Sequence, residues 1–225
     1  MKTESPLSPE FIKAVNDYYY LMKMEYPEKG SLKLVGDRYR LSTDLRTILY
    51  RGISSPQKVE SRKQRIIINC PDTISIDGYN VLFTLLNYRL GRIVFLSNDG
   101  ICRDAGSLFG KVPDAKLFND CVFLLIDYLG NSVESDVRIY LDSPVKSSPE
   151  HQDLLYKTAK SKGLPIKIIL TKSADQSLLD DPSGIIASSD SAIIDRTEKM
   201  ILDIPKYLLL HRYHAELLNL EALLR

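Results

Sequence analysis

Apolar side chains recur every three to four positions near the start of the chain, as on the buried face of a helix. They are Phe11, Val15, Tyr18, Tyr19 and Met22. Pro9 suits the first turn of this helix, and Pro27 and Gly30 end it. At this spacing at least two of the consecutive tyrosines, residues 18–20, are expected in a core.

Two further helices are predicted before residue 53. One covers residues 31–38, and the next opens at Ser42 or Thr43, where a hydroxyl can cap free backbone amides, and stops at Gly52. Residues 54–65 combine serines, a proline and alternating charges, which is typical of a linker. The first 60 residues are therefore expected to form a small all-α module.

The pattern changes after residue 65 to short runs rich in Ile and Val, each followed by a polar or turn residue. The runs are residues 73–77, 92–97, 137–142, 166–171 and 184–187. Helical spacing appears between them at Leu117, Cys121, Leu124 and Tyr128, and again near Leu154. Alternating strands and helices predict an α/β domain over residues 61–225, with a parallel sheet and helices on both faces.

The composition restricts the class of protein. The chain has 225 residues, of which 44% are hydrophobic and 26% are charged, so it can bury a core and is neither disordered nor fibrous. No apolar run approaches the roughly 20 residues needed to span a bilayer, and the polar start lacks the apolar core of a signal peptide. A cytoplasmic protein without a membrane partner is expected. Three cysteines without a CxxC spacing predict reduced, partly buried thiols, namely Cys70, Cys102 and Cys121.

The formal net charge of +1 hides an asymmetry. Residues 29–65 carry ten Lys or Arg against three acids, a net of +7, which leaves −6 for the remainder. Such a segment is typical of a module that binds a polyanion, and the alternative is a merely solvated basic surface. Tyr39 and Tyr50 lie among the candidate phosphate contacts, so unpaired bases could stack there. These contacts are Arg38, Arg40, Arg46 and Arg51.

Acidic residues follow the predicted strands. Asp77 and Asp142 close two of them, and Asp175 and Asp190 come shortly after two others. Because the carboxyl ends of parallel strands share one edge, these carboxylates are expected to converge there. Their repulsion predicts a divalent cation with oxygen ligands, Mg²⁺ or Mn²⁺. The alternative for any one of them is a turn former or helix cap, most plainly for Asp175 and Asp190.

Three motifs resemble those of the PIN-like nucleases, in particular their NYN branch. Ile-Asp-Gly-Tyr-Asn-Val-Leu at residues 76–82 resembles the opening strand and turn of that branch. Ser-Ala-Asp-Gln-Ser-Leu at 173–178 resembles its helix motif, and Ile-Ile-Ala-Ser-Ser-Asp at 185–190 resembles its late strand. The chain departs from the family at Gln176, where a second acid often stands. Residues 31–41, Ser-Leu-Lys-Leu-Val-Gly-Asp-Arg-Tyr-Arg-Leu, and residues 49–52, Leu-Tyr-Arg-Gly, resemble the short basic domain of an uncharacterised two-domain family of bacteria and archaea, in which that domain precedes a PIN-like domain.

The resemblance implies a PIN-like three-layer fold and metal-dependent hydrolysis of a phosphodiester, with RNA as the partner. It places the cation on the four aspartates, and Asn80 would position a phosphate or a water molecule. Further substrate contacts are expected from residues beside the same edge. They are Asp99, Arg103, Asp104, Lys172 and Ser189.

Two other functions stay open. A catalytically weak PIN-like protein would bind RNA or a protein without cutting, which the missing acid at residue 176 favours. A phosphohydrolase acting on a small molecule would need a closed pocket. Residues 206–225 are expected to form an amphipathic helix that packs on the sheet or makes a homodimer.

Overall fold

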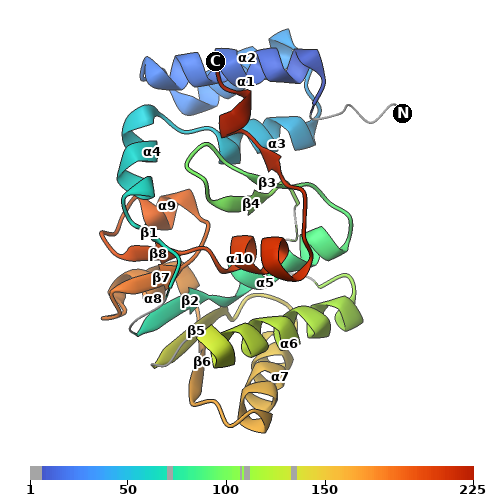
Figure 1. Ribbon diagram of the computed structural model, residues 1–225, viewed down its shortest axis with the longest axis vertical. Coiled ribbons are helices and arrows are strands. Elements are labelled where there is room, and N and C mark those ends of the chain that lie inside the picture. Colours follow the sequence, from blue (N-terminus) through green and yellow to red (C-terminus); the bar gives the residue numbers. More distant parts are fainter. Residues whose placement is uncertain (1–6, 70–72, 107, 109–111, 133–135) are drawn as a thin grey trace. The chain divides into compact units, whose positions relative to one another are not determined.

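The computed structural model describes residues 7–69, 73–106, 108, 112–132 and 136–225 (Figure 1). The chain forms two compact units. The first comprises Met1–Gln64, Arg92–Gly106 and Glu216–Arg225, and the second comprises Arg65–Gly91 and Ser107–Ala215. The first unit is therefore assembled from three stretches of the chain. Of the three cysteines, Cys102 and Cys121 are buried, and Cys70 lies outside the described residues.

Four helices begin the first unit: α1 (Pro9–Lys23), α2 (Glu28–Arg38), α3 (Thr43–Gly52) and α4 (Pro56–Lys63). The predicted helix starts at Pro9 and Ser42 are confirmed, because the Ser8 and Ser42 hydroxyls accept hydrogen bonds from the amides of the first turns. The predicted linker is wrong, since α4 occupies most of it. Pro56 at the first helical position favours that start, and the Arg62 side chain anchors the helix in the interior.

The core of the first unit gathers apolar side chains from all three of its stretches. Phe11 and Ile48 come from α1 and α3, and Phe95 and Leu220 come from the two later stretches. Tyr18 is fully buried, Tyr19 is half-buried and the Tyr20 side chain is 60% exposed. The prediction that at least two of these tyrosines lie in a core is fully met by Tyr18 and only in part by Tyr19, which packs against the core while partly exposed.

A small sheet completes the first unit. Its order is β4 (Cys102–Asp104), β3 (Val94–Leu96) and β9 (Leu218–Asn219), with β3 and β4 antiparallel. The prediction that residues 92–97 belong to the parallel sheet is wrong. Periodicity identifies a strand without its neighbours, and Phe95 packs into the core formed with the N-terminal helices.

The second unit is built on a six-stranded sheet in which every pairing is parallel. Its order is β1 (Ile66–Ile67), β8 (Met200–Leu202), β7 (Ile185–Ala187), β2 (Ile74–Asp77), β5 (Val137–Asp142) and β6 (Ile166–Thr171). The predicted α/β class is confirmed, and four of the five predicted strands lie in this sheet. The edge strand β1 and its neighbour β8 were not predicted.

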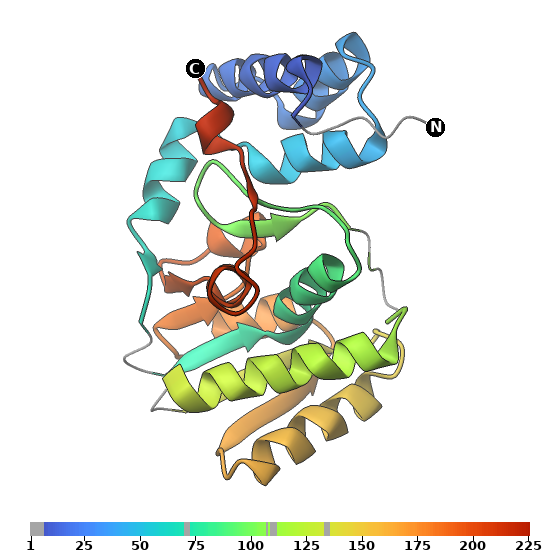
Figure 2. The same cartoon turned by 45° about the vertical axis from the view of Figure 1, so that its right-hand side comes forward.

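Helices cover both faces of this sheet (Figure 2). One layer contains α5 (Gly78–Arg89), α6 (Ala115–Ser132), α7 (Ser148–Ser161) and α10 (Ile204–Arg212), and the other contains α8 (Ala174–Asp180) and α9 (Ser191–Ile194). The predicted C-terminal helix is too long, because α10 packs on α5 and ends at Arg212. The chain then adds β9 and a short helix, Glu221–Leu223, to the first unit. Among the described residues, no helix is long and apolar enough to cross a membrane.

Candidate active site

The strand order predicts a ligand crevice at the centre of the parallel sheet. β2 and β7 are neighbours, yet the chain leaves β2 towards β5 on one side and leaves β7 towards β8 on the other. Connections that diverge in this way leave the carboxyl ends of the two strands uncovered, and ligands of open α/β sheets bind there. Every feature of the site described below belongs to the second unit.

Asp77 is the last residue of β2 and the N-cap of α5. Its Oδ1 accepts a hydrogen bond from the Asn80 amide at 3.1 Å, and the Ser188 hydroxyl donates to Oδ2 at 3.3 Å. The next residue must be small, because a Cβ on Gly78 would collide with the side chains of Ile139 and Leu141. The carboxyl is therefore held at the crevice by a tight strand-to-helix turn.

Asp142 and Asp175 approach the same edge from the next two strands. Asp142 ends β5, and its Oδ1 accepts a hydrogen bond from the Ala174 amide at 2.8 Å, which fixes the start of α8 against the end of β5. Asp175 is the second residue of α8, directly after Ala174. The order of β5 and β6 in the sheet thus brings two acids together that are 33 positions apart in the sequence.

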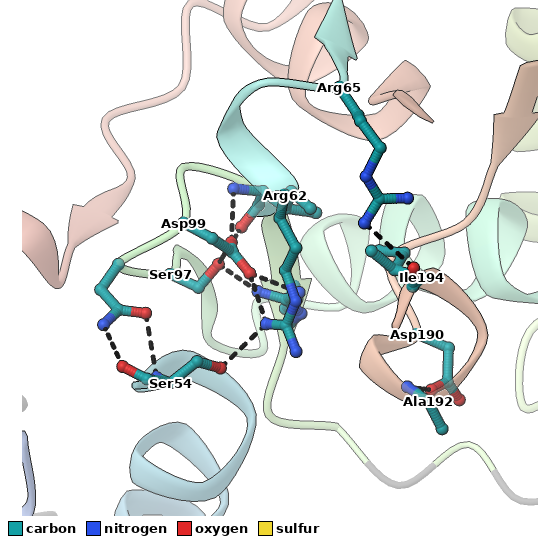
Figure 3. A network of polar contacts seen from close by, with 11 residues as sticks. Ser54, Arg62, Arg65, Ser97, Asp99, Asp190, Ala192 and Ile194 are labelled. Carbon is teal, nitrogen blue, oxygen red and sulfur yellow. Dashed lines mark hydrogen bonds and ion pairs between the residues drawn. The ribbon is translucent and has the colours of Figure 1, made fainter. Parts of the chain in front are cut away.

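The loop after β7 supplies the fourth acid and connects it to Asn80. The Asp190 Oδ1 accepts from the Ala192 amide at 2.7 Å and caps α9 (Figure 3). One residue earlier, the Ser189 amide and hydroxyl both donate to Asn80 Oδ1, at 2.8 and 3.0 Å. Asn80 and Ser189 are therefore positioned by each other across the crevice.

The four carboxyl groups influence one another electrostatically. Burial, together with the charges of Asp175, Asp142 and Asp190, raises the pKa of Asp77 to about 7, against the opposing hydrogen bond from the Asn80 amide. Partial burial and the charges of Asp190 and Asp142 also raise the pKa of Asp175, and Arg196 acts in the opposite direction. The charges of Asp142 and Asp190 thus act on both Asp77 and Asp175.

The donor set suits a hard cation. All the side-chain donors described above are oxygens, which Mg²⁺ and Mn²⁺ prefer. Within the described part of the chain, no three His, Cys, Asp or Glu side chains are close enough to form a preformed metal-binding group. Mg²⁺ needs fewer protein ligands than such a group provides, because it is usually held through one or two carboxylates and keeps several water ligands. The residues therefore fit a largely hydrated ion and do not fit a closed protein cage.

His151 lies beside the turn that follows β2, although no sequence motif indicated it. The Tyr79 hydroxyl and His151 Nδ1 are 3.0 Å apart, and the Phe118 ring lies against the imidazole with centroids 4.5 Å apart. Burial raises the pKa of Tyr79, and the charges of Asp142 and Glu150 act in the same direction. His151 is the fourth residue of α7, and only the packing of α7 shows that it reaches the Asp-Gly-Tyr-Asn turn.

Three residues predicted for this edge lie elsewhere. Asp99, Arg103 and Asp104 belong to the β3–β4 hairpin of the first unit, so the expectation that they share the edge with the four aspartates is wrong. Asp99 is fully buried, and both Arg103 and Arg62 donate hydrogen bonds to its carboxylate (Figure 3). Ser97 and Ser54 complete this network, which stabilises the hairpin against the end of α3 and α4.

The predicted phosphate contacts of the basic segment differ in their availability. Arg46 donates to Asp37 and to the Leu41 carbonyl oxygen, both at 3.0 Å, and Arg51 donates to the Asp104 carbonyl oxygen at 2.8 Å. Arg38 and Arg40 are exposed in the first unit. Lys172 is exposed directly after β6, at the carboxyl end of the parallel sheet.

Part of the basic segment has a structural role. Besides Arg62, Arg65 is buried in the second unit, where its guanidinium donates to the carbonyl oxygens of Ile194 and Thr197 (Figure 3). The net charge of residues 29–65 therefore overstates the positive charge that a polyanion can reach.

Comparison with known proteins places the chain among families without an assigned function. A family described as "Protein of unknown function (DUF434)" matches residues 10–65, and one described as "Domain of unknown function (DUF5616)" matches residues 70–207. An uncharacterized protein of Methanocaldococcus jannaschii is 28% identical over 197 residues, which cover 85% of this chain and 93% of that protein. No solved structure matches the chain significantly. Because the second of these family matches extends over more than half of the chain, the protein belongs to the family described as "Domain of unknown function (DUF5616)".

Proposed function

We propose that the second unit is a metal-dependent nuclease that hydrolyses phosphodiester bonds in RNA. The observation that carries the proposal is the group of four aspartates at the carboxyl edge of adjacent parallel strands, where burial and the charges of the other three raise the pKa of Asp77. Mutual repulsion of gathered carboxylates destabilises their ionised form, and a divalent cation removes that penalty. The resemblance of the three motifs to PIN-like nucleases supports the same chemistry.

Asp77, Asp142, Asp175 and Asp190 would hold Mg²⁺ or Mn²⁺. When bound, the cation supplies charge neutralisation for the phosphate and lowers the pKa of a water molecule for in-line attack. Asp77 is the central carboxylate, since it lies at the crevice and all three other acids act on its pKa. Its hydrogen bonds from the Asn80 amide and the Ser188 hydroxyl fix its orientation before substrate arrives.

Asn80 and Ser189 would position the substrate. The Asn80 oxygen accepts both hydrogen bonds from Ser189, so its amide NH₂ group is directed away from them and can donate to a phosphate oxygen. Lys172, exposed after β6, supplies a positive charge at the same edge of the sheet. These three side chains would contact the scissile phosphate and its neighbours.

One observation favours a binding protein without strong catalysis. No three potential ligands within the described residues form a preformed group, and Gln176 stands where a second acid is common in the resembled branch. Such a protein would bind RNA and cut it slowly or not at all.

The test is an assay of labelled single-stranded RNA with Mg²⁺, Mn²⁺ or a chelator. The Asp77→Asn variant removes the central carboxylate, and Asp153→Asn is the matched control, because Asp153 is an exposed acid on α7 paired with Lys157. We expect cleavage that requires the metal and is lost in Asp77→Asn but not in Asp153→Asn. Metal binding is read independently from the thermal shift that Mn²⁺ produces. Cleavage that persists in Asp77→Asn or in chelator would contradict the proposal.

A further inference from the structure

A surface pocket lies along α1 in the first unit. Its volume is about 720 Å³, and its walls come from α1, from Tyr39 after α2 and from Arg225. The α1 residues that line it lie opposite the buried face of that helix, which carries Phe11, Val15 and Tyr18. The pocket therefore lies on the outer side of α1, away from the core.

Cations and aromatic rings alternate along this pocket. Lys13, Tyr20 and Lys23 are exposed and follow one another at helical spacing, and Tyr19 and Tyr39 add two half-buried rings. Ten residues separate the two lysines, a distance of about 15 Å along a helix, so they would reach different phosphates of one strand. Tyr20 lies between them with 60% of its side chain exposed, which leaves a ring face for stacking.

The far wall of the pocket is fixed by specific contacts. The Tyr39 hydroxyl donates to Asp17 at 2.8 Å, and the Arg38 guanidinium lies over the Tyr39 ring, 5.5 Å from its centroid. Arg38 also lies 3.8 Å from the carboxylate of Asp17, the acid of the pocket lining. The negative charge of Asp17 is thereby partly compensated, and the lining keeps an excess of positive charge.

A second contact secures the other wall. The Asn16 amide donates to the Leu223 carbonyl oxygen at 2.9 Å, and the Arg225 amide donates to Asn16 Oδ1 at 2.8 Å. The last residues of the chain are therefore held against α1, and the pocket has two defined sides.

We propose that this pocket binds a single-stranded nucleic-acid segment, with bases stacked on Tyr20 and Tyr19 and phosphates held by Lys13 and Lys23. The inference rests on the proposed nuclease function, whose substrate it assigns to a particular surface. Charge complementarity and exposed rings favour an unpaired strand, because a duplex hides the base faces that stack on tyrosine. Three of the four arginines predicted from the basic segment already have partners within the first unit. Arg38 lies against Asp17 and the Tyr39 ring, and Arg46 and Arg51 are engaged as described above.

The experiment measures binding of the full chain to a fluorescein-labelled 15-residue oligouridylate by anisotropy, in chelator so that metal-dependent cutting cannot occur. Lys13→Glu combined with Lys23→Glu is expected to weaken binding at least about tenfold. The slope of log Kd against log salt should fall by about 1.4, because each phosphate contact to a single strand contributes about 0.7. Tyr20→Ala is expected to weaken binding about 5- to 150-fold, since stacking contributes about 1–3 kcal/mol per base.

The controls keep charge and aromatic content matched. Lys29→Glu combined with Lys33→Glu makes the same change in charge on α2, outside the pocket, and Tyr26→Ala removes another exposed tyrosine of the first unit. Both controls should bind within about twofold of the unaltered chain. DNA of matching sequence that binds as well still supports a single-strand site.

Three results would overturn the inference: no binding by the unaltered chain, equal weakening by the controls, or equal competition by a duplex. The cleavage assay separates this failure from that of the nuclease. If the protein cuts RNA in a metal-dependent way but the pocket substitutions leave binding unchanged, only the pocket proposal is refuted. Pocket-dependent binding without any cutting supports the pocket and refutes the nuclease.

Discussion

Asp99 and Asp77 are both buried carboxyl groups, one in each unit, and their surroundings have opposite charge. Burial raises the pKa of Asp99, but Arg103, Ser97 and Arg62 outweigh that effect, and the pKa falls well below its usual range. Burial also raises the pKa of Asp77, and there the nearby charges are three further acids, which raise it to about 7. The partners of Asp99 therefore favour its ionised form, whereas burial and the acids around Asp77 oppose ionisation there.

The difference separates a structural acid from a candidate functional one. A buried carboxylate with two guanidinium partners has its charge compensated inside the protein and needs no ligand. A buried carboxyl among acids lacks that compensation, and groups in this state are concentrated at functional sites. The type of residue is the same in both units, and only the partners differ.

The largest effect is expected when Asp99 loses its charge. Asp99→Asn would break two buried ion pairs, with Arg62 and with Arg103, and breaking a buried pair typically costs about 3–5 kcal/mol. Urea unfolding followed by circular dichroism measures this loss. If the free energy of unfolding fell by less than about 1 kcal/mol, the two arginines would not depend on Asp99.

In metal-free protein, Asp77→Asn is expected to increase the free energy of unfolding, whereas Asp99→Asn decreases it. The folded pKa of about 7 exceeds the unfolded value of 3.8, so the folded state binds more protons between those pH values and loses stability as the pH rises through them. The variant should be more stable than the unaltered chain at pH 8, by on the order of 4 kcal/mol, and nearly equal at pH 4.

The measurement is thermal unfolding at both pH values, first in chelator and then with Mn²⁺. The metal should raise the melting temperature of the unaltered chain and leave that of Asp77→Asn unchanged. A variant that is less stable at pH 8 would show that Asp77 is compensated in the way that Asp99 is.

Asp181 provides an intermediate case in the same unit as Asp77. Burial raises its pKa, but hydrogen bonds from Ser183, Tyr140 and Arg138 lower it to about 2. Arg138→Gln should cost about 1–2 kcal/mol at pH 7, because the carboxylate loses its cationic partner and keeps the other donors. The pKa is lowered in the folded state, so this loss should shrink as the pH falls from about 4 towards 2. A loss independent of pH would mean that packing of the Arg138 stem is responsible.

The smallest change in stability is expected for Asp127→Asn, which tests whether burial decides the cost of losing an ion pair. It pairs with Lys162 at 2.7 Å and Arg212 at 2.8 Å, so it has two cationic partners as Asp99 does, but its side chain is 36% exposed. Asp127→Asn should change the free energy of unfolding by less than about 1 kcal/mol, and less still in high salt. A loss comparable to that of Asp99→Asn would show that the number of partners, and not burial, decides the cost.

Local sequence patterns predicted which segments form helices and strands more reliably than they predicted which sheet or core each segment joins. The starts of α1 and α3 follow from prolines and serines within a few residues, and the strands that carry Asp77 and Asp142 follow from their Ile and Val runs. The strand at Val94–Leu96 was also recognised, but its sheet was not, because pairing partners come from distant segments. Helix α4 was missed because its charged sequence resembles a linker until Arg62 is seen to be buried.

The candidate site divides in the same way. Four acids at strand ends were identified from the sequence, since parallel strands necessarily direct their carboxyl ends to one edge. The sequence did not indicate His151 or Ser188. His151 contacts Tyr79 because α7 packs near the turn after β2, and Ser188 contacts Asp77 because β7 and β2 are neighbouring strands. Arg103 and Asp99 were predicted as site residues because the sequence of a turn after a strand does not show whether the strand belongs to the parallel sheet or to the β3–β4 hairpin.

The sequence by itself determined the class of the fold, the helices at its start and the acids at the strand ends, because these depend on contacts within a few residues and on the geometry of parallel strands. Only the tertiary structure decided which charges are available to a ligand. Arg46, Arg62, Arg65 and Arg103 are engaged within the units, whereas Lys13, Tyr20 and Lys23 line an open pocket. Burial and pairing of a side chain depend on residues far away in the chain, and a local sequence pattern does not show which distant residues will be its neighbours.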